Sequence, residues 1–290
     1  MKVIFDLFKN IFYCNRFFGD SNKLIKKELY SVDDLITDLE TNAKLLYINN
    51  TKDSIIYIDE EYLSKVMLFN KCSFQKYNTF IQQLENRDIG ILNPINREID
   101  PINFKMIETY TYYKDSDLLH ILQTRVLNNN VIKNIIRELI KTTKLIHDAG
   151  FAHRDMKLEN ILYTENNNIY FIDCVMSTVY NNDEYFRGGT QQYACPEIFN
   201  NEIINDWRKT DIWSLGIIIF TILMNEFPWV RADTTHCSIF KDYYNLKEKS
   251  LFWVNYNIEP VYKKILLHSL DIDPNKRYNI DELQLLIDSV

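Results

Sequence analysis

The sequence is poor in glycine: it has six among 290 residues, and none lies between Gly19 and Gly90. Its five cysteines are scattered, odd in number and without CxxC spacing. This argues against a disulfide framework and a cysteine-based zinc site, and it favours a reducing, cytoplasmic location. The net charge of -7 provides no overall basic field, so we expect no nucleic-acid partner.

Long apolar runs are also missing. The strongest candidate, residues 215–224 (LGIIIFTILM), has about half of the roughly 20 residues that a membrane span needs. We interpret it as a buried core helix and expect no transmembrane segment. At the N-terminus, charged residues interrupt any signal-peptide core, while apolar residues recur with helical spacing. A helix packed on its own domain is favoured there, and contact with a membrane surface is the alternative.

Hydrophobic periodicity divides the chain into a strand-rich part and a helical part. Alternating or β-branched runs predict strands at 43–48, 54–59, 62–69 and 104–110, with helices at 31–41 and 74–89. From about residue 130 the spacing is mostly helical, interrupted by the short strands NILYT and IYFID. We therefore predict an α+β fold: an N-terminal, mainly helical extension (1–30), a small strand-rich lobe (31–110) and a larger helical lobe (111–290).

The stretch HRDMKLEN, residues 153–160, lies where a predicted helix gives way to a strand. Phosphoryl transfer requires a base near the accepting hydroxyl, a cation near the moving group and oxygen ligands for Mg²⁺. Asp155 can accept the hydroxyl proton, and Lys157 can offset the charge of the transferred group. Asn160 supplies a neutral oxygen for Mg²⁺. Asp173, which ends the strand IYFID, supplies a second, acidic ligand.

These residues resemble the catalytic loop of the eukaryotic-type serine/threonine protein kinase family, in which HRD is followed by Lys and Asn. Four later motifs resemble those of the family in the same order: GTQQY (189–193), ACPE (194–197), DIWSLG (211–216) and DPNKR (273–277). The resemblance extends from about residue 60 to the end. It implies a bilobal protein-kinase-like fold that transfers the γ-phosphate of ATP to Ser/Thr hydroxyls of protein substrates, with Asp155 as the base.

The resemblance also implies supporting roles in the large lobe. Arg277 should pair with Glu197 inside the lobe, and Asp211 should brace the backbone of the catalytic loop. His153 is expected to be a packed core residue rather than an acid–base group. Thr190 resembles the threonine that contacts the catalytic Asp and Lys, which, with the catalytic-loop lysine, favours a Ser/Thr over a Tyr specificity.

Two further expectations concern substrate and regulation. Arg154 is predicted to pair with Asp183 or Glu184, so that activity needs no phosphorylation of the activation loop. Glu159 stands where kinases directed at basic substrates contact an arginine. The second acidic position of that pattern is Thr221 here, so the preference for basic substrates is only half supported.

The small lobe departs from the family pattern. Lys65, in YLSKVML, should bind the α- and β-phosphates and pair with Glu85 of the next helix. The candidate phosphate loop, residues 49–54 (NNTKDS), has no glycine, and Leu63 replaces a small alanine. The usual Asp-Phe-Gly is Asp-Cys-Val here, and since Val175 does not readily take a positive φ, we expect a stiffer segment.

These departures leave alternatives to an active kinase. One is a pseudokinase that acts as a nucleotide-binding or protein-binding scaffold. Retention of Asp155, Lys157, Asn160 and Asp173 favours the active enzyme over that alternative. Another is a small-molecule kinase of related fold, which the protein-substrate platform suggested by GTQQYACPE disfavours.

Overall fold

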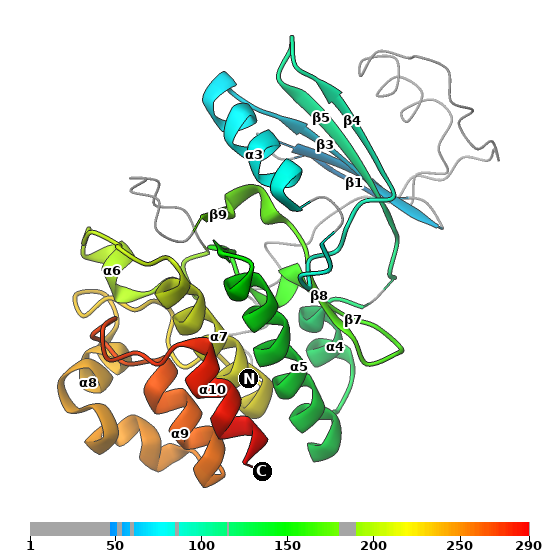
Figure 1. Cartoon of the computed structure of the whole chain (residues 1–290). Coiled ribbons are helices and arrows are strands. Elements are labelled where there is room, and N and C mark those ends of the chain that lie inside the picture. Colours follow the sequence, from blue (N-terminus) through cyan, green and yellow to red (C-terminus); the bar gives the residue numbers. More distant parts are fainter. Residues whose placement is uncertain are drawn as a thin grey trace. The chain divides into compact units, whose positions relative to one another are not determined.

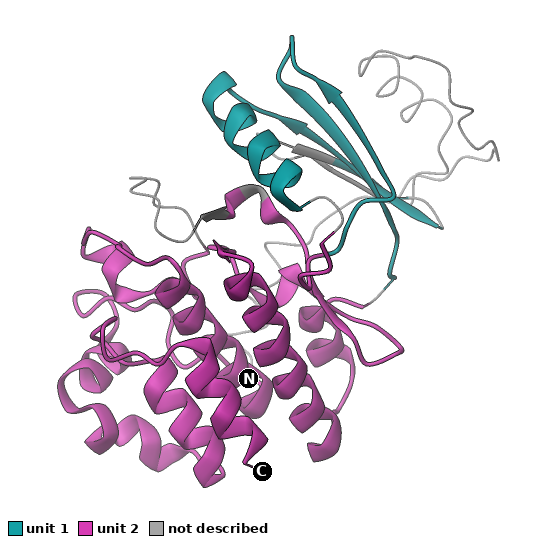
Figure 2. Cartoon of the chain, viewed as in Figure 1, with its two compact units in different colours: residues 1–85, 92–114 teal, residues 86–91, 115–290 magenta. Residues whose placement is uncertain are grey.

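The computed structural model describes residues 47–50, 54–58, 61–84, 87–114, 116–179 and 190–289. The chain forms two compact units (Figure 2): the first takes residues up to 85 together with 92–114, and the second takes 86–91 together with 115–290. The short segment 86–91 therefore belongs to the second unit, although the first unit resumes after it. The helices predicted at 1–30 and 31–41 lie outside the described residues.

The first unit contains an antiparallel five-stranded sheet, in the order β1-β2-β3-β5-β4, and a helix alongside it (Figure 1). Its described elements are β1 (Tyr47–Asn50), β2 (Ser54–Ile58), β3 (Tyr62–Leu68), α3 (Lys71–Leu84), β4 (Asn96–Asp100) and β5 (Lys105–Thr111). The strands predicted at 54–59, 62–69 and 104–110 are confirmed. β4 was not predicted, because its sequence NREID is charged and lacks the β-branched and aromatic residues of typical strands.

Helix α3 follows from an apolar stripe with helical spacing. Phe74, Tyr77, Phe80, Ile81 and Leu84 are all buried, while the residues between them are largely exposed. The hydroxyl of Tyr77 donates to the carboxylate of Glu108 on β5, so the helix packs on the face of the sheet that carries Glu108. The described helix ends at residue 84, before the predicted end at 89.

The second unit is mainly helical, with two small two-stranded sheets. Its described elements are α4 (Leu118–Thr124), α5 (Asn129–Asp148), β6 (Phe151–Ala152), η1 (Leu158–Asn160), β7 (Ile161–Tyr163), β8 (Ile169–Phe171), η2 (Cys174–Met176), β9 (Thr178–Val179), α6 (Pro196–Phe199), α7 (Arg208–Met224), α8 (Ser238–Leu246), η3 (Lys247–Lys249), η4 (Leu251–Asn255), α9 (Pro260–Ser269) and α10 (Ile280–Asp288). The α+β prediction, with strands first and helices second, is confirmed.

Helix α7 forms the centre of this unit, between α5 and α9. It contains the run LGIIIFTILM, whose residues from Leu215 to Ile222 are all buried, so the predicted core helix is confirmed. A Cβ at Gly216 would lie 2.8 Å from the Cβ of Ser269, which explains why glycine stands at this crossing. Within the described residues, no helix has both the length and the apolar character needed to cross a membrane.

Candidate active site

The catalytic-loop residues lie between β6 and β7, and three of the predicted side chains meet there. Lys157 Nζ lies 2.9 Å from Asp155 Oδ2. Asn160 Nδ2 donates to the backbone oxygen of Asp155 at 2.9 Å and to its Oδ2 at 3.2 Å. The η1 turn (158–160) begins directly after the lysine, and strand β7 begins directly after Asn160, which fixes the spacing of these groups.

Thr190 completes this cluster from a distant part of the chain. Its hydroxyl donates to Asp155 Oδ1 at 3.2 Å and accepts from Lys157 Nζ at 3.2 Å. The predicted contact of this threonine with both catalytic-loop side chains is confirmed. The carboxylate is thus oriented by three neighbours, and its two oxygens are engaged by different partners.

Asp173 is brought to the same loop by the β7–β8 hairpin. Ile161 pairs with Phe171, and the next amide, Ile172 N–H, donates to Asn160 O at 2.9 Å. Asp173 therefore directly follows Ile172, whose backbone is hydrogen-bonded to the backbone of the predicted metal ligand Asn160. Its backbone is left-handed, with φ 61° and ψ 60°. The chain therefore leaves the extended conformation of β8 at Asp173, the predicted metal ligand.

The donor set fits Mg²⁺. Because Asn160 Nδ2 faces Asp155, the amide carbonyl is the remaining metal-binding atom of that side chain. With the carboxylate of Asp173 it offers two hard oxygen donors. Among the described residues, no three His, Cys, Asp or Glu side chains converge as a metal cage.

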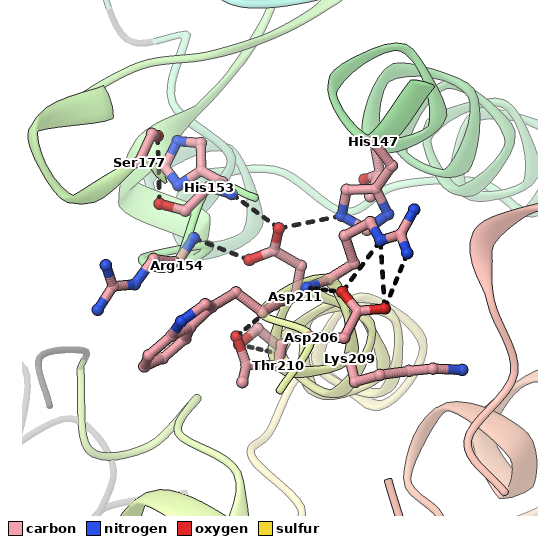
Figure 3. A network of polar contacts seen from close by, with 12 residues as sticks. His147, His153, Arg154, Ser177, Asp206, Lys209, Thr210 and Asp211 are labelled. Carbon is pink, nitrogen blue, oxygen red and sulfur yellow. Dashed lines mark hydrogen bonds and ion pairs between the residues drawn. The ribbon is translucent and has the colours of Figure 1, made fainter. Parts of the chain in front are cut away.

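A buried aspartate, Asp211, holds the backbone of the catalytic loop in place through hydrogen bonds (Figure 3). Asp211, which is 1% exposed, accepts the backbone N–H of His153 at 2.7 Å and that of Arg154 at 2.8 Å. His147 Nε2 lies 3.0 Å from the same carboxylate. Because helix α7 supplies the aspartate, the catalytic loop is fixed to the centre of the unit, as predicted.

His153 links the loop to the strand that precedes Asp173. The residue is fully buried, its Nδ1 accepts the N–H of Asp155 at 3.4 Å, and its Nε2 lies 3.1 Å from Ile172 O. Both ring nitrogens are used in backbone contacts. The interpretation as a packed core histidine is therefore confirmed.

Arg154 has a left-handed backbone (φ 69°), and its guanidinium lies 3.8 Å from the ring centroid of Trp207. Such stacking is a favourable use of a planar cation. Its predicted partners Asp183 and Glu184 lie outside the described residues. Beside it, a shallow open cleft is lined by Asp155, Thr190 and residues of the ACPE segment.

Glu159 is half-buried beside the catalytic cluster, where Tyr193 Oη donates to its carboxylate at 3.2 Å. Burial raises the pKa of Glu159 above its usual value, and the nearby Lys157 opposes this shift. The ACPE segment is anchored by a buried ion pair, in which Arg277 Nη1 lies 2.9 Å from Glu197 Oε1. That predicted pair is confirmed.

In the first unit, Lys65 lies on β3 as predicted, with a half-buried side chain. Its predicted partner Glu85 and residues 51–53 of the candidate phosphate loop lie outside the described residues. The sequence prediction missed one group in this unit: Glu108 on β5, a carboxylate that is only 1% exposed. Its signal was a lone acidic residue on the apolar face of the strand KMIETYT.

The two units and the cluster around the catalytic loop define a kinase-like class of protein. The model of the protein kinase domain matches residues 90–285, and the chain belongs to this family. The resemblance to eukaryotic-type serine/threonine protein kinases and the kinase-like fold are thereby confirmed.

Curated relatives agree with this assignment. Serine/threonine-protein kinase ppk34 of Schizosaccharomyces pombe is 34% identical over 151 residues, covering 51% of this chain and 41% of the relative. CBL-interacting serine/threonine-protein kinase 20 of Arabidopsis thaliana is 24% identical over 273 residues, covering 91% and 59% respectively. CBL-interacting protein kinase 2 of Oryza sativa is 26% identical, covering 90% and 58%. The chain thus spans between 41% and 59% of the length of these relatives.

Proposed function

We propose that the protein is an active serine/threonine protein kinase that transfers the γ-phosphate of ATP to hydroxyl groups of protein substrates. The observation that carries the proposal is the cluster in which Asp155, Lys157 and Thr190 contact one another beside Asn160. The names of the relatives support the Ser/Thr class. A scaffold would have no need to keep the carboxylate of Asp155, which lines an open cleft, 2.9 Å from the ammonium group of Lys157.

Each residue has a proposed role. Asp155 accepts the proton of the substrate hydroxyl, and Lys157 offsets the charge on the transferred group. Lys65, paired with Glu85, binds the α- and β-phosphates. Asn160 and Asp173 would bind Mg²⁺, which when present offsets the negative charge of the phosphates.

The cleft beside the catalytic loop is the proposed site for the protein substrate. It is lined by Thr190, Tyr193 and Cys195, which come from the segment that follows the activation loop in sequence. We also propose an intracellular location, since the described cysteines Cys72, Cys174, Cys195 and Cys237 are all free thiols.

The test compares phosphoryl transfer by the full chain with that by Asp155→Asn. Labelled ATP, Mg²⁺ and a generic basic protein are the substrates, and binding of a fluorescent ATP analogue is measured in parallel. Loss of the base should reduce transfer by roughly 10²–10⁴-fold. Binding of the analogue should be little changed.

Asp148→Asn, an exchange of the same kind at an exposed position of α5, serves as the control and should retain full activity. Nucleotide binding without any transfer by the unaltered chain would instead identify a pseudokinase scaffold. Equal transfer by the chain and by Asp155→Asn would show that the assigned base is wrong.

A further inference from the structure

The first unit contains a buried carboxylate that the roles proposed above do not use. Glu108, on β5, is 1% exposed. Its Oε1 accepts from Arg97 Nε at 2.7 Å, and its Oε2 accepts from the hydroxyls of Tyr77 at 3.0 Å and Tyr110 at 2.7 Å. A charge is rarely buried in a protein unless its partners compensate for the loss of water. Here three donors, from α3, β4 and β5, converge on the carboxylate of Glu108.

The strand register places this carboxylate beside the predicted phosphate-binding lysine. Glu108 is the direct partner of Arg97 on β4 and of Lys65 on β3. Directly opposed residues of antiparallel strands lie on the same face, with Cβ atoms about 4.5–5.5 Å apart. One anion therefore stands between two cations in a row across three strands, and the lysine has a flexible stem that can reach along this row.

The rest of that face offers no competing acid. In the described parts of β2 to β5, the other side chains on the same face as Lys65 are apolar or uncharged apart from Arg97: Ile56, Ile58, Leu63, Met67, Ile99, Met106 and Tyr110. The acidic residues Glu98 and Asp100 pair with Ile107 and Lys105, on the opposite face. Within these strands, Glu108 is thus the carboxylate that can attract the ammonium group of Lys65.

We propose that Glu108 is a positioning residue for nucleotide binding: its carboxylate orients Lys65 from the adjacent strand and, through Tyr77, fixes helix α3 on the sheet. The inference rests on the proposed kinase function, because it assigns a partner to the phosphate-binding lysine. A single buried group then performs two tasks, alignment of the lysine and attachment of the helix.

The test is a double-mutant cycle on binding of a fluorescent ATP analogue with Mg²⁺, using the full chain. Glu108→Gln keeps the shape and removes the charge, and it should weaken binding and raise KM for ATP by about tenfold. Lys65→Met should cause a similar loss, and the double variant should lose no more than Lys65→Met alone. Glu108→Asp, which retains the charge, should recover part of the affinity.

Two matched variants serve as controls. Glu98→Gln makes the same exchange on the other face of the sheet, where the side chain accepts from Asn96 of its own strand, and should leave binding unchanged. Glu85→Gln tests the competing partner. Losses of Glu108→Gln and Lys65→Met that simply add, or a coupling to Lys65 found for Glu85 and not for Glu108, would overturn the proposal. So would a lower thermal midpoint for Glu108→Gln with unchanged affinity.

Two further arrangements keep the test decisive. If Glu108→Gln does not fold, the same cycle is run with Glu108→Asp, whose loss should again be non-additive with that of Lys65→Met. If the unaltered chain binds no nucleotide, the proposed function fails, and the cycle is measured on the urea midpoint without ligand. Lys65→Met should then lower the midpoint in the unaltered chain but not beside Glu108→Gln; equal shifts in both backgrounds would refute the pairing.

Discussion

The exchange Glu197→Gln should strongly destabilise the second unit. In the folded protein, Arg277 Nη1 and Nη2 lie 2.9 Å and 3.1 Å from the two carboxylate oxygens of Glu197 and form a bidentate ion pair with them. The side chains are 0% and 5% exposed, so water cannot replace a lost partner. The exchange preserves the volume of the side chain and removes only its charge.

The expected loss of stability follows from the contacts that Arg277 keeps in the Glu197→Gln variant. Its guanidinium still donates to the backbone oxygens of Lys209 and Asp271 and lies 5.1 Å from the ring centroid of Trp213. None of these groups carries a negative charge, so the cation stays buried and uncompensated. Breaking a buried pair in this way typically costs roughly 3–5 kcal/mol. That is a large part of the about 5–15 kcal/mol that stabilises a typical domain.

Urea unfolding followed by circular dichroism measures this cost. The matched control is Glu138→Gln, which removes a carboxylate from an ion pair of 3.2 Å with Lys141 on the exposed surface of α5. Exposed pairs contribute about 0–1 kcal/mol. If Glu197→Gln cost no more than this control, the argument that burial gives the pair its strength would be wrong.

Three more exchanges test other parts of the second unit. Thr190→Val removes the hydroxyl that contacts both catalytic side chains; kcat should fall about tenfold with little change in KM, and Thr190→Ser should restore it in steady-state assays. Asn279→Ala breaks the capping box of α10 and should cost about 1 kcal/mol in thermal unfolding while activity is retained; an unchanged Tm would contradict this. Burial raises the pKa of Glu159, so its stabilising contribution is complete below the unfolded value of 4.5 and is lost as the pH rises through the folded pKa. Glu159→Gln should therefore remove this loss, and urea midpoints that show the same pH dependence in both proteins would exclude the assigned cause.

The sequence predicted the second unit better than the first for a physical reason. In the second unit, chemical motifs and apolar helices coincide: the HRD stretch follows α5, and Asp211 lies in the first turn of α7. The contacts of Asp211, Thr190 and Arg277 each join segments far apart in the chain, so spacing alone could not reveal them. The ordered resemblance to a family supplied that information.

In the first unit, no ordered series of family motifs indicated which segments are in contact. Strand β4 has the sequence NREID, in which charged residues conceal the alternation that marks a strand. Glu108 was read as one residue of a strand, because its significance depends on the register that sets it opposite both Arg97 and Lys65. Register is a property of pairing between strands, and a one-residue shift would place the carboxylate on the other face.

The turn that carries Asp173, the predicted metal ligand, lacks the glycine of the family pattern. The chain has Asp-Cys-Val where a glycine was expected, and Val175 was predicted to resist a positive φ. The left-handed residue is instead Asp173 itself, and Cys174–Met176 form a 3-10 turn without a positive φ. Valine is therefore compatible with this backbone, and its presence does not argue against metal binding.

A left-handed non-glycine residue costs on the order of 1–3 kcal/mol and persists only where its surroundings enforce it. Two such residues flank the catalytic chemistry, Arg154 directly before Asp155 and Asp173 itself. The first is fixed by the bond from its N–H to Asp211, and the second follows Ile172, whose oxygen contacts His153. The buried network of Asp211 and His153 thus offsets strain at two positions of the candidate active site.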